Sequence, residues 1–79
     1  MRVLIRFIAT YRSYLPPEAA GNSCVLEVAP GTSAEDLVGQ YGIPLDNSSV
    51  ILVNGHTVDL AAPLQEGDVL AAFPAMAGG

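Results

Sequence analysis

Apolar residues recur at every second position at the start of the chain. The apolar positions are Val3, Ile5 and Phe7, and the polar positions between them are Arg2 and Arg6. A spacing of two is typical of a β-strand with one buried face. The same alternation returns over residues 23–29, and the segment 10–22 between the two contains a Pro-Pro pair that cannot continue a strand. We therefore expect strands over residues 1–9 and 23–29, joined by a long hairpin connection.

The sequence after Pro30-Gly31 has the features of a helix start. Thr32 and Glu35 have the spacing of a capping box, in which each side chain bonds the backbone amide of the other residue. Gly42 fits the left-handed position that ends many helices. The expected buried stripe consists of Leu37, Val38 and Tyr41, which stand at helical spacing. One helix of about three turns is predicted.

Two further apolar runs, residues 50–53 and 69–73, predict strands that are apolar on both faces. Between them, Asn54-Gly55 is a strong two-residue hairpin signal, so we expect a returning strand over residues 56–58. The order strand, strand, helix and three strands predicts an α+β fold of the β-grasp type, a mixed sheet of four to five strands with one helix across one face. Since the helix covers only one face, we expect a partner protein to contact the other, at the outward residues of the last strands and at Leu4 and Ile8.

Length and composition narrow the possibilities. With 79 residues, the chain has room for a single domain, 1–79, which we divide into a folded body (1–73) and a flexible C-terminal tail (74–79). The single cysteine, Cys24, excludes an internal disulfide, a cysteine-rich zinc site and a four-thiolate iron–sulfur cluster. No apolar stretch approaches the roughly 20 residues of a membrane span, and no targeting segment is visible. We expect a cytoplasmic protein with no membrane partner.

The charge balance bears on possible partners. Three Arg against eight acidic residues give a net charge of -5, which argues against nucleic acid as a partner. A protein partner is instead expected to be basic where it meets the chain. There is no lysine, because all three basic residues are arginine, so this chain cannot form lysine-linked chains of itself.

Three segments in order resemble the ubiquitin-like sulfur carriers. They are Val-Asn-Gly-His-Thr-Val at 53–58, Leu-Gln-Glu-Gly-Asp-Val at 64–69, and Phe-Pro-Ala-Met-Ala-Gly-Gly at 73–79. The sequence is most similar to the small subunit of molybdopterin synthase, the MoaD type, with the thiazole-pathway carrier ThiS as a near relative. The resemblance implies a ubiquitin-like β-grasp that binds no cofactor or metal of its own and has no independent catalytic activity.

The resemblance also implies the chemistry of the C-terminus. An E1-like enzyme would adenylate the Gly79 carboxylate with ATP and Mg, and a sulfur donor would convert it to a thiocarboxylate. A larger synthase-type subunit would then take the sulfur for the molybdopterin or tungsten-pterin cofactor. Gly78, like Gly79, lacks a Cβ and can pass through a narrow channel. The six residues 74–79 can reach roughly 20 Å when extended. The residues expected to contact a partner are Phe73, Pro74, Ala75, Met76 and Ala77, with Phe73 as aromatic anchor.

Other interpretations remain open. Many MoaD-type carriers have a second proline and a valine where this chain has Ala75-Met76, which leaves the pathway undecided between the pterin and thiazole types. A ubiquitin-like protein modifier or a noncovalent interaction domain would also fit the fold. Phe73 could equally be a core residue, and we expect Cys24 to be buried and His56 to be a solvated turn residue. Three acidic residues are expected in turns, where they could face a basic partner near the tail: Asp59, Glu66 and Asp68.

Overall fold

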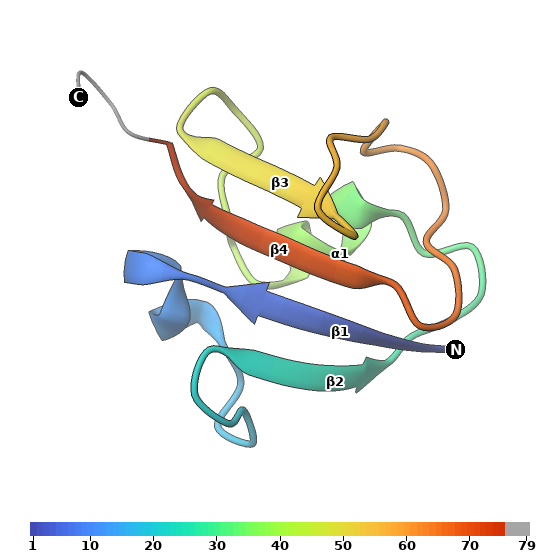
Figure 1. Ribbon diagram of the computed structural model, residues 1–79, viewed down its shortest axis with the longest axis horizontal. Helices are drawn as coiled ribbons and strands as arrows, with labels where there is room; N and C mark the ends of the chain where they lie inside the picture. Colours follow the sequence, from blue (N-terminus) through green and yellow to red (C-terminus); the bar gives the residue numbers. More distant parts are fainter. Residues whose placement is uncertain (76–79) are drawn as a thin grey trace.

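A computed structural model describes residues 1–75 of the chain (Figure 1). The elements in chain order are β1 (Arg2–Phe7), the 3-10 helix η1 (Ala9–Tyr14), β2 (Ser23–Glu27), α1 (Ala34–Gln40), β3 (Ser49–Val53) and β4 (Val69–Pro74). The sheet has the order β2-β1-β4-β3, with β1 and β4 parallel and both outer strands antiparallel to their neighbours. The mixed sheet with one α-helix confirms the predicted β-grasp, and η1 is the element that the sequence did not predict.

The core lies between the sheet and α1. The alternation in β1 is confirmed, because Val3, Ile5 and Phe7 are at most 1% exposed while Arg2 and Arg6 face solvent. The helix and the neighbouring strand β4 complete this layer with fully buried side chains, Leu37, Val38, Leu70 and Ala72. Burying one large aliphatic side chain stabilises the fold by about 1.5–3 kcal/mol, so this layer holds the sheet and helix together.

The helix starts one residue later than predicted. Its capping box is formed by Ser33 and Asp36, whose side chains each accept a hydrogen bond from the other's amide. The predicted pair was wrong because the hydroxyl of Thr32 donates instead to the carbonyl of Ala29, at 2.7 Å, and closes the turn before the helix. The helix has seven residues, about two turns where three were expected. Gly42 has a φ of +80°, which confirms its left-handed position after the helix.

The predicted strand over residues 56–58 is wrong. Asn54 and Gly55 do have positive φ values, 54° and 82°, as the hairpin signal predicted. However, His56 alone pairs back on Val53, and the chain then leaves the sheet. It leaves because it must reach the helix, where the carbonyl of Leu60 accepts the amide of Glu35 at 2.9 Å. The sheet of the described residues therefore has four strands, and β3 is its edge.

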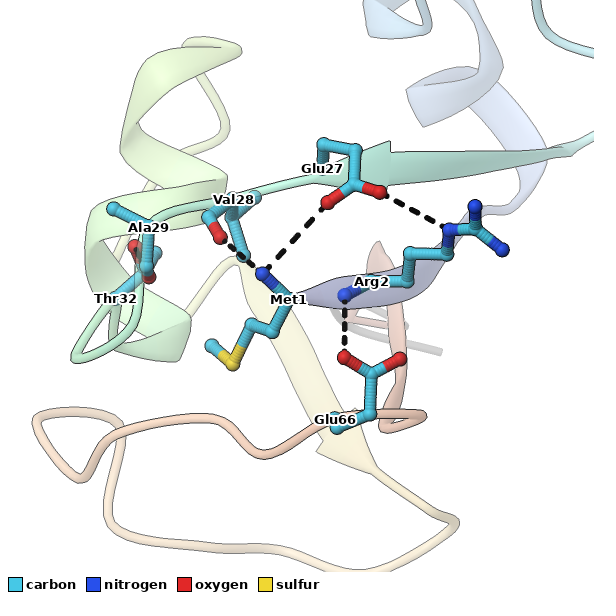
Figure 2. Close-up of polar contacts among 7 residues, drawn as sticks. All are labelled: Met1, Arg2, Glu27, Val28, Ala29, Thr32 and Glu66. Carbon is cyan, nitrogen blue, oxygen red and sulfur yellow. Dashed lines mark hydrogen bonds and ion pairs between the residues drawn. The ribbon is translucent and has the colours of Figure 1, made fainter.

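Polar contacts tie together the end of the sheet where β1 and β4 begin (Figure 2). The Met1 amino group donates to the carbonyl of Val28 at 2.8 Å, and the Arg2 guanidinium pairs with Glu27 at 3.0 Å. The Arg2 amide donates to the carboxylate of Glu66, also at 3.0 Å. These bonds link β1 to the end of β2 and to the turn that leads into β4.

Candidate functional site

The candidate site lies at the C-terminal end of β4, where the tail begins. β4 continues to Pro74, and the amide of Ala75 still donates to the carbonyl of Ser48 at 2.8 Å. The chain is therefore held against the start of β3 up to Ala75. The predicted site residues Met76, Ala77, Gly78 and Gly79 lie outside the described residues.

Pro74 ends the contact between β4 and β1. The last bond of this parallel ladder joins the amide of Ile8 to the carbonyl of Ala72, at 3.0 Å. The next donor on this side would come from residue 74, and proline has no N–H. At the same level the other strand turns away, because Ala9 adopts a left-handed φ of 56°. Beyond Pro74, β4 therefore has a hydrogen-bonded neighbour on the β3 side alone.

A buried tyrosine reinforces this remaining contact. Tyr11 of η1 is 6% exposed, and its hydroxyl lies 2.6 Å from the Oγ of Ser49 and 3.3 Å from the carbonyl oxygen of Ser48. The Ser48 carbonyl thus accepts from both the Tyr11 hydroxyl and the Ala75 amide. We name Tyr11, Ser48, Ser49 and Ala75 the tail clamp, because together they fix where the C-terminal segment leaves the sheet.

The turn before β3 supports the tail clamp. The carboxylate of Asp46 accepts hydrogen bonds from both the amide and the hydroxyl of Ser48. These two bonds favour the ionised form and lower the pKa of Asp46, the hydroxyl having the larger effect. The amide of Ser49 also donates to the carbonyl of Asp46, at 3.2 Å. The clamp therefore rests on a hydrogen-bonded turn.

Phe73 lies on the sheet face opposite the helix. Leu70 and Ala72 point into the core, so alternation places Phe73 on the outer face, where it is partly exposed beside Val50 of β3. Phe73 therefore does not belong to the set of buried core residues. Leu4 and Ile8, which we also expected in a partner contact, are likewise partly exposed. The partner itself stays a prediction.

Two of the three turn acids, Glu66 and Asp68, lie far from the start of the tail. Asp68 precedes β4 and Pro74 ends it, so the length of the strand separates this turn from Pro74. The carboxylate of Asp68 accepts hydrogen bonds from the amide of Gln65 at 2.8 Å and from the side chain of Asn54 at 3.0 Å. For these two residues the expectation of an acidic face at the start of the tail was wrong, because their carboxylates bind groups at the opposite end of the sheet. For Asp59 it stays a prediction.

The remaining candidate residues show no reactive grouping. His56 is exposed at the hairpin turn as expected, and Cys24 is partly buried in β2. The pKa of Tyr41 is raised, first by burial and then by the nearby Cys24 and Glu18. Within residues 1–75, no three His, Cys, Asp or Glu side chains gather in a way that could hold a metal ion. In the same part of the chain, no helix has the length and apolar character needed to cross a membrane.

Nearly the whole chain matches a known protein family, described as Mut7-C ubiquitin, whose model covers residues 1–78. The chain belongs to the Mut7-C ubiquitin family. No curated protein matches it. Membership confirms the predicted resemblance at the level of a ubiquitin-like family.

Solved structures agree with this assignment at the level of the fold. A protein described as molybdopterin converting factor, subunit 1, from Pyrococcus furiosus is 24% identical, with a TM-score of 0.71 over 92% of this chain and 95% of its own. SAMP1 from Haloferax volcanii is 22% identical, with a TM-score of 0.74 over the full length of both chains. This chain and these two proteins thus share one β-grasp architecture.

Sequence reasoning did not find the tail clamp. Tyr11 stood in a segment interpreted as an irregular connection, and Ser48 and Ser49 stood in a polar turn. The available signal was a tyrosine four residues after the end of β1, because a tyrosine that is buried there needs a hydrogen-bond partner for its hydroxyl. The partner, at Ser48 and Ser49, is 37 and 38 residues away along the chain, a separation that local patterns do not bridge.

Proposed function

We propose that this chain is a sulfur carrier that acts through a thiocarboxylate at Gly79. The observation that carries the proposal is the tail clamp, in which the amide of Ala75 donates to the carbonyl of Ser48 at 2.8 Å, while the sequence continues for four residues to Gly78-Gly79. A carboxylate at the end of such a segment can enter the active site of a partner while the folded body is docked outside it. The neighbour described as a molybdopterin converting factor subunit supports sulfur transfer to a pterin.

The proposed reaction involves three partners, an E1-like enzyme, a sulfur donor and a synthase-type subunit, and it loads the sulfur onto Gly79 in two steps. First, a Gly79 carboxylate oxygen attacks the α-phosphorus of Mg-bound ATP on an E1-like enzyme, which forms the acyl-adenylate and releases pyrophosphate. Second, a sulfur donor that supplies sulfide attacks the acyl carbon. The bond from this carbon to the phosphate oxygen breaks, AMP leaves, and the thiocarboxylate remains. A synthase-type subunit then catalyses transfer of this sulfur to a pterin precursor. The bond from the acyl carbon to sulfur breaks, and water supplies the oxygen that restores the Gly79 carboxylate.

The test is removal of Gly79, measured by ATP–pyrophosphate exchange with the E1-like enzyme of the native host. We expect the shortened chain to bind this enzyme and to lose adenylation. The matched control is Gly78→Ala, which keeps the terminal carboxylate and adds one methyl group, so it should retain part of the activity. Adenylation of the chain without Gly79 at the normal rate would contradict the proposal.

Phe73 is the proposed anchor for docking. It is partly exposed on the outer face at the base of the tail. Phe73→Ala should weaken binding to the synthase-type subunit by about 2 kcal/mol, the usual scale for an aromatic hot spot. Titration calorimetry measures this effect, and Gln40→Ala, a truncation of an exposed side chain on the helix that covers the other face of the sheet, is the control. Equal affinities of the Phe73 variant and the original chain would exclude the anchor.

A further inference from the structure

The edge of the sheet at β3 lacks the strand that the sequence predicted for it. β3 is the last strand in the order β2-β1-β4-β3 and is drawn in yellow in Figure 1. Only His56 pairs back on it, at Val53. The rest of this edge is therefore open to another strand, and open edges are the places where extended chains add to a sheet.

The ladder between β3 and β4 shows which residues point outward. The amide of Ala75 donates to Ser48 and the amide of Asn54 donates to Val69, so the hydrogen-bonded pairs fall on the even-numbered residues of this segment. Because antiparallel strands alternate, the odd-numbered residues of β3 direct their N–H and C=O groups away from β4.

Two of these three outward residues already form hydrogen bonds within the chain. Val53 exchanges two hydrogen bonds with His56, at 2.9 and 3.1 Å, and Ser49 is bound through its amide, which donates to the carbonyl of Asp46. The third is Ile51, whose N–H and C=O have no hydrogen-bond partner among residues 1–75. Backbone N–H and C=O groups without partners on a sheet edge can pair with an added strand, so these two groups are suited to one residue of such a strand.

A hollow lies along the same edge. Val50 and Ile51 of the strand line it, and Leu45 and Val58 line it from the loops before and after β3. Leu45 and Val58 are 49% and 41% exposed, two of the four large apolar side chains that are exposed in the described part of the chain. The hollow can therefore take up apolar side chains beside the open backbone.

The charge around the hollow is negative. Asp46 lines it, and Asp59 directly follows Val58. None of the described residues that line the hollow is Lys, Arg or His. A segment that carries a lysine or arginine beside its apolar residues therefore complements this edge better than a neutral or acidic one.

We propose that the β3 edge binds an extended segment of a partner protein by strand addition. One residue of that segment exchanges two hydrogen bonds with Ile51, alternate apolar side chains enter the hollow, and a basic side chain lies near Asp46. None of the proposed contacts uses Gly79, so binding at the β3 edge should not depend on whether the chain carries sulfur.

A phage-displayed library of random short peptides tests the proposal, because it presents extended segments without assuming a partner. Selected peptides are synthesised and titrated into ¹⁵N-labelled protein. We expect them to share alternating apolar residues with a Lys or Arg, to slow exchange of the Ile51 amide by roughly tenfold or more, and to bind with dissociation constants below about 1 mM.

Peptide methylation separates strand addition from simple apolar contact. N-methylation of the peptide residue opposite Ile51 removes a donor of the new ladder and should abolish binding, whereas methylation of the next residue, whose N–H points away, should leave binding intact. Leu45→Lys and Val58→Lys should each weaken binding roughly tenfold through repulsion of the basic peptide. Val25→Lys on the opposite edge is the matched control and should change nothing.

Three results would overturn the proposal. The selected peptides could shift resonances of the outer face or of β2 in place of β3. Saturation with peptide could leave the exchange of the Ile51 amide unchanged. Finally, the library could yield no peptide that binds more tightly than about 1 mM.

Discussion

The two ends of the sheet are held in different ways. Where β4 begins, exposed polar side chains form a network: the Asn54 side chain donates to Asp68 at 3.0 Å and accepts the Val69 amide at 2.9 Å, and Glu66 accepts the Arg2 amide. Where β4 ends, the contacts combine one buried hydroxyl, that of Tyr11, with the turn in which Asp46 binds Ser48.

This difference shows how one small fold can have its strands joined to the surrounding turns by hydrogen bonds at one end of the sheet and release a strand from one of its neighbours at the other end. The polar network joins β1, β3 and β4 to the turns around them, so hydrogen bonds hold these strands to their turns at that end of the sheet (Figures 1 and 2). At the other end Pro74 ends the contact between β4 and β1, and the tail clamp holds the chain to β3 up to Ala75. The end proposed to react is therefore the end where the chain has a hydrogen-bonded neighbour on one side alone.

The largest expected effect comes from breaking the polar network with Asn54→Ala. The change removes two side-chain hydrogen bonds and puts alanine at a φ of 54°, so it should lower the free energy of unfolding by about 2–3 kcal/mol. Urea denaturation measures it, with Asn47→Ala in an exposed turn as control. A loss in the free energy of unfolding no greater than that of Asn47→Ala would show that the polar network does not stabilise this end of the sheet.

The second-largest expected effect tests the tail clamp separately from the rest of the fold. Tyr11→Phe keeps the ring and removes the hydroxyl, so it should cost about 1 kcal/mol and should speed hydrogen exchange of the Ala75 amide selectively. NMR exchange rates test this, with Tyr14→Phe, an exposed tyrosine on the same 3-10 helix, as control. If the Ala75 amide exchanges equally fast in both variants, Tyr11 does not hold the tail.

A third substitution, at Ala9, should stabilise the end of the sheet where β1 turns away from β4. Ala9 has a φ of 56°, a conformation that glycine adopts without strain. Relief of this strain outweighs the extra freedom of glycine in the unfolded chain, so Ala9→Gly should raise the free energy of unfolding by about 0.5 kcal/mol. Ala61→Gly, at an exposed alanine without positive φ, should instead lower it. Thermal denaturation measures the stability of the two variants. A loss of stability in both would show that Ala9 is unstrained.

The smallest effect concerns pH. The pKa of Asp46 is lowered from 3.8 by the hydrogen bonds of Ser48, so the folded state binds this proton less readily than the unfolded state. The stability that Asp46 contributes is therefore present above pH 3.8 and is lost as the pH falls through the lowered value. Asp46→Asn should be less stable than the original chain at neutral pH and equally stable in strong acid. Thermal unfolding across this range tests it, and a constant difference would contradict the assignment.

Much of this fold could be predicted from local pattern. Alternation identified the buried face of β1, the two positive φ values followed from Asn54-Gly55, and Gly42 marked the end of the helix. These features depend on neighbours in the sequence, and local chemistry determines them. The helix start was displaced by one residue because Thr32 and Ser33 are both good caps, and only the turn to Ala29 decides between them.

Features that depend on distant residues could not be predicted. The strand over 56–58 is absent because Leu60 is bound by Glu35 of the helix, and the clamp depends on the meeting of Tyr11 with Ser48. The candidate site divides in the same way. Its chemistry was inferred from the sequence of the tail, whereas the device that positions the tail became visible only in three dimensions.

The measurement that tests the central claim most directly is high-resolution intact mass spectrometry. The protein is taken from its native host and is also incubated with Mg-ATP, the E1-like enzyme and a sulfide source. Fragmentation must locate the change, because oxidation of Met1 or Met76 adds nearly the same mass as exchange of one carboxylate oxygen for sulfur. The account predicts sulfur in place of oxygen at Gly79. An unchanged Gly79 carboxylate under both conditions, or a Gly79 joined to other proteins, would contradict it.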